Sequence, residues 1–254
     1  MALSFACNTS TNTETTTVQD TTGLVPDSTA VYDTLISVPA RDTVLFGFYQ
    51  GVLPCKDCQG IRHTLLLKDS GRFKLEEFVL GKDMFPQKME GRWTRADDSL
   101  RLQANRQIIA TYFVSNDTLR LAYRQGSPVV DSLSKNYVVA RQSNAASNTA
   151  WKSKFNSGVD FYGIGTEPFW NIEIDNEKSI SFKLADLPQP IVVPMVQPTV
   201  TKDSVFYSTT AQGAKLEVTI YNEFCSDGMS DNLYEYRVHV RYKGEAFKGC
   251  GVRR

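Results

Sequence analysis

The feature that most constrains the fold is a two-residue alternation of apolar and polar side chains along the first half of the chain. It is clear in "RFKLEEF" at 72–78, "LRLQA" at 100–104 and "DTLRLAY" at 117–123. This period is typical of strands with one buried face. Turn-forming residues separate the segments, as in "KDSG" and "RQGSP". We predict eight short strands, near 44–53, 61–68, 72–80, 88–95, 99–104, 107–114, 118–124 and 135–141.

Eight short strands joined by tight turns predict an antiparallel meander. A meander of this size removes its exposed edges by closing into an up-and-down barrel. The second half is also rich in strand-like segments, such as "FWNIEID", "KLEVTIYN" and "LYEYRVHVRY". We therefore predict an all-β protein with a second, small β-barrel or β-sandwich domain.

A shift in composition indicates the domain boundary. The segment "RQSNAASNTAWKSKFNSG" is rich in Ser, Asn and Ala and poor in large apolar residues. The predicted division is a tether at 1–43, a barrel at 44–142, a linker at 143–157 and the second domain at 158–254. A short helical turn is compatible with the linker.

The N-terminal "MALSFACNTS" resembles the end of a lipoprotein signal, with a small residue before Cys7. A full signal has a basic region and a longer apolar core, so we expect the signal to be truncated here and Cys7 to be the lipidated residue. The following Thr-rich run has almost no large apolar side chain and cannot form a core. It is typical of a flexible tether between an anchor and a folded domain.

Composition excludes some partners. The 254 residues carry 28 Lys and Arg against 28 Asp and Glu, with no long run of one sign. Nucleic acid and anionic membranes both favour a basic protein face, so this balance argues against them. No stretch of about 20 apolar residues is present, so no transmembrane helix is expected.

Cys55 and Cys58 form a C-x-x-C pair, which suits a redox couple, half of a metal site or a structural disulfide. A thioredoxin-type couple sits at a helix N-terminus, whereas strands flank this pair, so a redox enzyme is disfavoured. An oxidising compartment favours a local disulfide that clips the turn.

A copper or zinc site remains an alternative. Two thiolates at this spacing suit Cu(I) or Zn(II), and His63 lies five residues after Cys58. A soft ion could also take sulfur from Met84 or Met89. However, His63 shares a strand face with Ile61, Leu65 and Leu67, where a histidine is more often a core residue.

The stretch "YQGVLPCKDCQGIRHTLLL" resembles the opening of the NlpE family of outer-membrane lipoproteins. The residues that match the family pattern are Gly51, Leu53, Pro54, Cys55, Asp57, Cys58, Gly60 and Ile61, with Thr64 one position late. "GRWTR", "LRL" and "NYVVAR" extend the resemblance over about 44–142. It implies a lipocalin-like barrel, a lipid anchor, and links to copper resistance and envelope stress.

The second domain departs from NlpE itself. "GTEPFW", "CSDGMS" and the late "GC" resemble a poorly understood domain of secreted bacterial proteins. Cys225 and Cys250 predict a disulfide that pins the C-terminal tail, with a soft-metal site at Cys225 and Met229 as the alternative. In "EPFW" we expect Phe169 or Trp170 in the core and Glu167 at the rim, where the mouth of a ligand site is conceivable.

These observations favour a non-enzymatic, monomeric lipoprotein on the outer membrane, facing the periplasm and serving envelope stress sensing or copper homeostasis with an envelope signalling partner. Neither resemblance supplies a catalytic residue. One alternative is a barrel that carries a small apolar ligand, since eight strands enclose room for side chains or one such ligand. The other is a thiol-disulfide redox protein that uses Cys55 and Cys58.

Overall fold

The structure, a computed structural model, describes residues 45–130 and 135–254. The tether expected at 1–43 and the lipidation site expected at Cys7 lie outside the described residues. Within the described ranges, no helix has both the length and the apolar character needed to cross a membrane.

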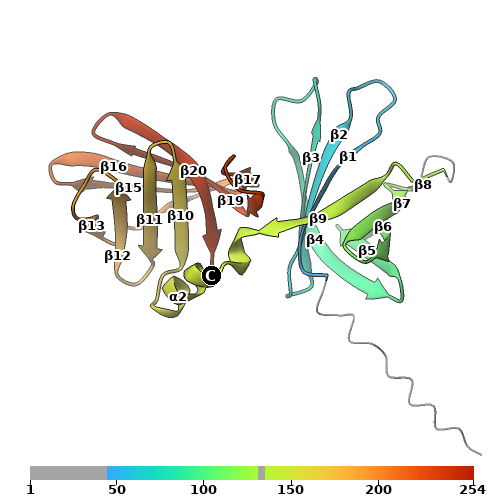
Figure 1. Cartoon of the computed structure of the whole chain (residues 1–254), viewed down its shortest axis with the longest axis horizontal. Coiled ribbons are helices and arrows are strands. Elements are labelled where there is room, and N and C mark those ends of the chain that lie inside the picture. Colours follow the sequence, from blue (N-terminus) through green and yellow to red (C-terminus); the bar gives the residue numbers. More distant parts are fainter. Residues whose placement is uncertain (1–44, 131–134) are drawn as a thin grey trace, which may run out of the picture. The chain divides into compact units, whose positions relative to one another are not determined.

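Seven strands of the first half form a meander that an eighth closes. These are β1 (Gly47–Leu53), β2 (Ile61–Leu67), β3 (Arg72–Val79), β4 (Gln87–Ala96), β5 (Ser99–Ala104), β6 (Gln107–Ser115), β7 (Thr118–Arg124) and β9 (Val138–Asn144). Consecutive strands from β1 to β7 pair antiparallel, and β9 pairs with both β1 and β7 (Figure 1). The predicted up-and-down barrel is confirmed. Sequence reasoning missed the two-residue strand β8 (Ser127–Pro128), which pairs with β7.

The inward side chains of these strands form one core, as the alternation predicts. On β5, Leu100 and Leu102 are fully buried while Arg101 between them is exposed. The largest members of the core include two tyrosines, Tyr49 and Tyr112, neither of which reaches solvent. Because each buried side chain of this size stabilises the fold by about 1.5–3 kcal/mol, the alternation alone accounts for a closed apolar interior.

The segment predicted as a linker contains regular structure. A 3-10 helix at Ala145–Ser147 and helix α2 (Thr149–Asn156) follow β9 directly. The side chains of Asn144 and Asn148 accept hydrogen bonds from backbone N–H groups at the two helix starts, as N-cap residues do. Trp151 on α2 is buried against Tyr162 and Tyr234. The exact division at 142 and 158 stays a prediction.

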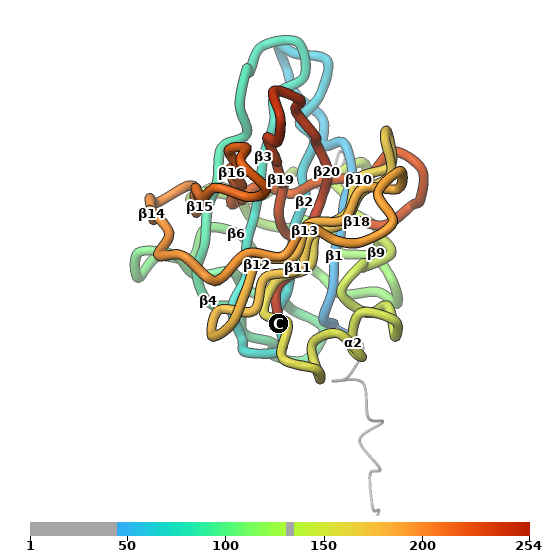
Figure 2. Tube along the Cα trace, turned by 90° about the vertical axis from the view of Figure 1, so that its left-hand side faces the viewer, coloured from blue at the N-terminus to red at the C-terminus, as the bar shows by residue number. Residues whose placement is uncertain are grey.

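A nine-stranded antiparallel sheet makes up most of the second half. Its strands are β10 (Phe161–Thr166), β11 (Phe169–Asp175), β12 (Ser179–Leu184), β13 (Ile191–Pro194), β14 (Thr199–Val200), β15 (Ser204–Ala211), β16 (Ala214–Tyr221), β19 (Tyr236–Tyr242) and β20 (Glu245–Arg253). Their order is β13-β12-β11-β10-β20-β19-β16-β15-β14 (Figure 2). The two remaining strands, β17 (Cys225–Ser226) and β18 (Asn232–Tyr234), pair with each other, and β18 pairs with residues 143–144 of β9.

This sheet curls so that its inner face forms a single core. Ile172 and Phe182 near one end of the strand order share a cluster with Tyr207 and Val218 near the other, and β13 contacts β15. The fold class is therefore confirmed as all-β, with a barrel followed by a second curled sheet. The proline-rich segment "LPQPIVVPMVQP" supplies the edge strand β13.

Part of the outer face of β2 and β3 is buried as well, which alternation does not predict. Phe224 packs edge-on against Phe48, with ring centroids 5.0 Å apart, and both join a cluster with Leu66 and Leu233. The backbone N–H of Phe224 donates a 2.9 Å hydrogen bond to the carboxylate of Glu76. Residues 222–235 thus cover one side of the barrel.

Lys74 is the centre of this contact. Its Nζ lies 5.1 Å and 4.9 Å from the ring centroids of Phe224 and Tyr236 and donates a 2.6 Å hydrogen bond to Asn222. Burial lowers the pKa of Lys74, against the raising effect of the nearby Glu235 carboxylate. Two aromatic faces and a carboxylate around one ammonium group offset the cost of taking the charge out of water.

Replacing Phe224 by alanine should expose Lys74. Loss of a buried Phe side chain costs about 3–5 kcal/mol of stability. Here it weakens the contact of residues 222–235 with β3, which buries Lys74. We expect acetylation of Lys74 by an amine-reactive ester to speed up about tenfold, the effect of roughly 1.4 kcal/mol on an opening equilibrium. Peptide mass spectrometry gives the rate, with exposed Lys183 as the internal standard. A Phe169→Ala variant, which removes a 60% exposed ring, is the control. Equal Lys74 rates in both variants would contradict this role.

Candidate functional site: the disulfide loop at the end of the barrel

Cys55 and Cys58 lie in the loop between β1 and β2, and the structure joins them in a disulfide with their Cα atoms 5.4 Å apart. Both cysteines are partly buried and pack against the barrel core that contains Leu53 and Ile61. The side chains at the tip, Lys56 and Asp57, are exposed. The loop therefore closes one end of the barrel with its apolar sulfurs inward and its charged tip outward.

Gly60 shows why the loop turns where it does. Its φ of +136° is a conformation that side chains rarely adopt, and a Cβ at this position would overlap Val52. The carbonyl of Gly60 accepts a 2.9 Å hydrogen bond from the N–H of Leu80, and Cys58 Sγ lies 3.4 Å from the same carbonyl. The disulfide loop is thus tied to the loop between β3 and β4.

Large apolar side chains are exposed in these neighbouring segments. Met84 and Phe85 in the β3–β4 loop are 86% and 73% exposed, and Val52 at the end of β1 is 56% exposed. A single exposed apolar residue needs no explanation, but several on adjoining segments are typical of a surface that contacts another molecule.

His63, the third candidate metal ligand, has a different role. It is 1% exposed, and its Nδ1 lies 2.8 Å from a carboxylate oxygen of Glu77 while its Nε2 lies 2.9 Å from the hydroxyl of Tyr112. Arg124 donates a 2.6 Å hydrogen bond to the other oxygen of Glu77. Both ring nitrogens are therefore occupied inside the barrel, as expected of a satisfied core histidine.

The chemistry of the loop depends on its redox state. In the disulfide neither sulfur is a thiolate, so Cys55 and Cys58 could hold copper or zinc only after reduction. Among residues 45–130 and 135–254, no cluster of three or more His, Cys, Asp or Glu side chains is arranged to hold a metal ion. A copper site at Cys55, Cys58 and His63 stays a prediction, and it would require His63 to leave both of its present partners.

The barrel interior bears on the carrier alternative. A cavity lined by His63, Met89 and Tyr112, among others, measures about 10 Å³. Ligand pockets typically measure about 300–1,000 Å³. A ligand could enter this cavity only if the core rearranged.

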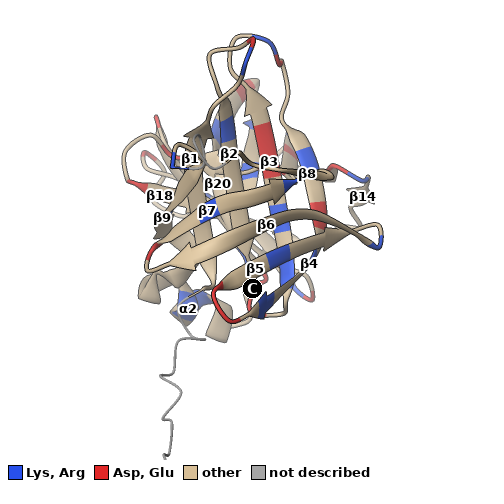
Figure 3. Ribbon diagram, turned by 90° about the vertical axis from the view of Figure 1, so that its right-hand side faces the viewer, with Lys and Arg blue, Asp and Glu red and all other residues tan. Residues whose placement is uncertain are grey.

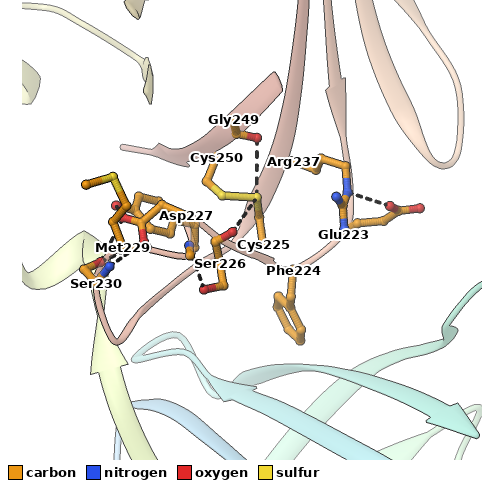
Figure 4. Close-up of a disulfide and its surroundings, with 12 residues drawn as sticks. Glu223, Phe224, Cys225, Ser226, Asp227, Met229, Ser230, Arg237, Gly249 and Cys250 are labelled. Carbon is orange, nitrogen blue, oxygen red and sulfur yellow. Dashed lines mark hydrogen bonds and ion pairs between the residues drawn. A yellow bond between two sulfur atoms is a disulfide. The ribbon is translucent and has the colours of Figure 1, made fainter. Parts of the chain in front are cut away.

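The second cysteine pair stabilises the segment that covers the barrel. Cys225 and Cys250 form a disulfide with their Cα atoms 5.5 Å apart, directly after Phe224 (Figure 4). Both cysteines are buried, while Met229, the other candidate for a soft-metal site, is 67% exposed. Asp227 accepts hydrogen bonds from Ser230 and from the hydroxyl of Tyr234, at 2.7 Å for the latter. Although burial opposes it, these hydrogen bonds hold the pKa of Asp227 below its ordinary value.

The "EPFW" residues divide between surface and core. Trp170 is 4% exposed inside the second sheet, whereas Glu167 and Phe169 are exposed. The indole N–H of Trp170 has no hydrogen-bond partner among the described residues, and Gly165 leaves room for the ring. The role of Glu167 and Trp170 at a ligand rim stays a prediction.

Sequence reasoning missed Glu77 and Tyr112 as partners of His63, Arg124 as a partner of Glu77, and Lys74 as the anchor between the two halves. Glu77 carried a signal, because it falls in register with apolar Phe73 and Leu75 on the inward face of β3. A charged residue at an inward position needs a buried partner. Arg124 had no such signal, since a β-bulge shifts the register of β7 before it.

Comparison with known proteins supports the resemblance of the first domain. The model of the NlpE N-terminal domain family matches residues 49–131. Lipoprotein NlpE of Escherichia coli K12 is 34% identical over 83 residues, which is 32% of this chain and 35% of that protein. The chain thus matches about a third of the length of this relative. The expected resemblance is confirmed for the first domain, and the resemblance proposed for the second domain stays a prediction.

Two solved structures are also similar. One is a candidate lipoprotein from Shewanella oneidensis, with 28% identity, 38% of this chain and 87% of that chain covered, and a TM-score of 0.32. The other is the Cpx pathway activator NlpE from Escherichia coli, with 17% identity, 78% and 96% covered, and a TM-score of 0.30. At these scores the structural matches add nothing to the sequence match.

A Glu77→Gln variant should be less stable at neutral pH and less sensitive to acid. Burial alone would raise the pKa of Glu77, but His63 and Arg124 outweigh it and hold this pKa below the ordinary 4.5. A lowered folded-state pKa stabilises the protein above the ordinary value, and this stabilisation disappears as the pH falls through the folded-state value. Urea unfolding at pH 7 and at points below 4.5 measures both effects. A variant that loses stability below pH 4.5 as steeply as the parent would contradict a stabilising role of ionised Glu77.

The two disulfides should differ in their effect on stability. The loop-entropy relation gives about 3.5 kcal/mol for a ring of 25 residues and less than about 2 kcal/mol for a ring of three. We expect the Cys225→Ser/Cys250→Ser variant to melt well below the Cys55→Ser/Cys58→Ser variant in thermal scans of oxidised protein. Similar losses of melting temperature in both variants would show that the Cys55–Cys58 disulfide stabilises more than its own turn.

Proposed function

We propose that this chain is a non-enzymatic lipoprotein of the outer membrane that faces the periplasm and takes part in envelope stress sensing or copper resistance. The match of residues 49–131 to the NlpE N-terminal domain carries this proposal, because the disulfide loop lies inside the matched segment. The relative in Escherichia coli is described as a lipoprotein and as a Cpx pathway activator. The lipid anchor on Cys7 would bring the folded part of the chain to the membrane.

The end of the barrel that carries the disulfide supports a role in contacting another protein. Exposed Met84, Phe85 and Val52 adjoin a loop whose conformation is held by a disulfide and by the hydrogen bond between Leu80 and Gly60. A rigid loop beside apolar side chains loses little conformational freedom on binding. We infer that an envelope signalling protein binds here, and that the chain acts as a monomer.

The alternatives have less support. A redox enzyme needs a reactive thiolate, and the loop that holds Cys55 and Cys58 connects two strands, without a helix N-terminus at the pair to lower a thiol pKa. A carrier needs a larger interior cavity than the one beside His63. A role of the cysteine pair in copper resistance remains part of the proposal, through the reduced loop.

Complementation tests the proposal. The chain, produced with a full lipoprotein signal, should restore Cpx reporter activation or copper tolerance to an Escherichia coli strain lacking NlpE. The Cys7→Ser variant should restore neither response, because a chain that cannot be acylated is not held at the membrane. Absence of both responses, with normal amounts of membrane-bound protein, would overturn the proposed function.

The cysteine pair and the apolar residues can be separated in the same assay. If the pair is only a clip, the Cys55→Ser/Cys58→Ser variant should keep copper tolerance and lose at most a few degrees in melting temperature. Loss of copper tolerance without a change in melting temperature would instead assign a metal role to the thiols. Met84→Ser/Phe85→Ser should reduce the reporter response while leaving the fold intact, and Val192→Ser/Val200→Ser, at two exposed apolar positions of the second sheet, is the matched control.

A further inference from the structure

Strand register groups arginines on one outer face of the barrel. Arg72 on β3 lies directly opposite Arg92 on β4, and Arg101 on β5 lies opposite Thr94, two positions further along β4. Directly opposite residues of antiparallel strands share a face, with Cβ atoms about 5 Å apart. Figure 3 draws Lys and Arg in blue, and blue segments appear on both β4 and β5, which are neighbours in the sheet.

These three arginines lack partners for their charge. Arg72, Arg92 and Arg101 are exposed, and no ion pair joins any of them to an acidic side chain of residues 45–130 or 135–254. Like charges placed directly opposite across a strand pair are destabilising. The pairing of Arg72 with Arg92 therefore costs stability in the free protein, and a bound anion would remove that cost.

Acidic groups lie at the borders of this face. From the Arg72–Arg92 pair on β3 and β4 to Phe113 on β6, the outward positions carry no acidic residue. Glu90, the next outward residue on β4, accepts a hydrogen bond from Asn222. Asp97 and Asp98 sit in the turn between β4 and β5. The face is thus locally basic in a chain whose formal charges cancel.

Two apolar side chains stand beside the arginines. Ile108 and Phe113 on β6 are 45% and 42% exposed, and register places Ile108 opposite Gln103 and Phe113 opposite Ser99, on the outer face. The guanidinium of Arg120 lies over the Phe113 ring, 4.9 Å from its centroid. Basic side chains next to exposed apolar ones are typical of surfaces that bind at the membrane interface.

We propose that this arginine face, formed by Arg72, Arg92 and Arg101 with Ile108 and Phe113, binds the headgroup surface of an anionic lipid bilayer. Guanidinium groups make paired hydrogen bonds to phosphate, and the apolar pair can enter the boundary beneath the headgroups. A nucleic acid fits less well, because single-strand binding uses an open aromatic face for base stacking and Arg120 covers the Phe113 ring. The proposal does not depend on the lipid anchor or on the proposed signalling role.

Vesicle binding tests it on the full chain with Cys7→Ser, which removes the expected acylation site. Sedimentation should show binding to vesicles with about 30 mol% phosphatidylglycerol in phosphatidylcholine and none to phosphatidylcholine alone. Raising the salt from about 0.05 M to about 0.5 M should release the protein, because screening shortens the reach of the charges. No binding to the anionic vesicles at low salt would overturn the proposal.

A charge-reversal pair locates the surface. Each basic residue near an anionic bilayer contributes about 1 kcal/mol, or about fivefold in partitioning, so Arg92→Glu/Arg101→Glu should weaken vesicle binding at least tenfold. The control is Arg241→Glu/Lys248→Glu, with the same change in net charge at two exposed strand positions of the second sheet. Phe113→Ser should also weaken binding.

Four results from these experiments would refute the proposal. Equal losses in the two charge-reversal variants would mean that net charge alone matters. Unchanged vesicle binding in Arg92→Glu/Arg101→Glu would place the lipid contact elsewhere. A short single-stranded oligonucleotide that binds the parent more tightly than the vesicles do would point to a nucleic acid, and an acidic protein captured by this face without lipid binding would point to a protein partner. Circular dichroism melting of each variant confirms that it is folded.

Discussion

The pairing of β9 with both β1 and β7 is the interaction on which the rest of the first domain depends. It closes the barrel, so every strand of the meander has two neighbours and its backbone groups are satisfied along most of its length. Gly51 permits this closure, because a Cβ there would lie 2.5 Å from the carbonyl oxygen of Val138. Closure fixes which side chains point inward, brings Tyr112 to His63, and leaves the disulfide loop at one end.

The sequence predicted the architecture of this domain well because one face of most strands is buried and the other meets water. That condition fails on β2 and β3, where Leu66 and Lys74 face outward and are nevertheless buried by residues 222–235. Contacts between segments about 150 residues apart leave no periodic signal in either segment. The alternation on β3 therefore gives no sign that Lys74 is buried.

The candidate site was also predictable only in part, because contacts between distant strands leave no signal in the sequence of either strand. The spacing of Cys55 and Cys58 allowed a disulfide among three possibilities, and the strands on both sides favoured it. The core position of His63 follows from its apolar neighbours on the strand. Its partner Tyr112 comes from β6, 49 residues later, and only the closed barrel brings the two together. The arginine face likewise exists only because strand pairing brings residues of β3, β4 and β5 together. A balanced charge count argued against an anionic membrane, but strand register decides where charges gather, and composition carries no information about register.

The sequence positions of these contacts set an order for folding as the chain emerges from its N-terminus. All eight strands of the barrel lie between residues 47 and 144, so the barrel can close once that segment has emerged. The segment that covers Leu66 and Lys74 follows roughly 80 residues later, and chains fold from the N-terminus as they are delivered. For that interval Phe48 and Leu66 on the outer wall of the barrel are open to solvent, and they become buried only when Phe224 and Leu233 arrive.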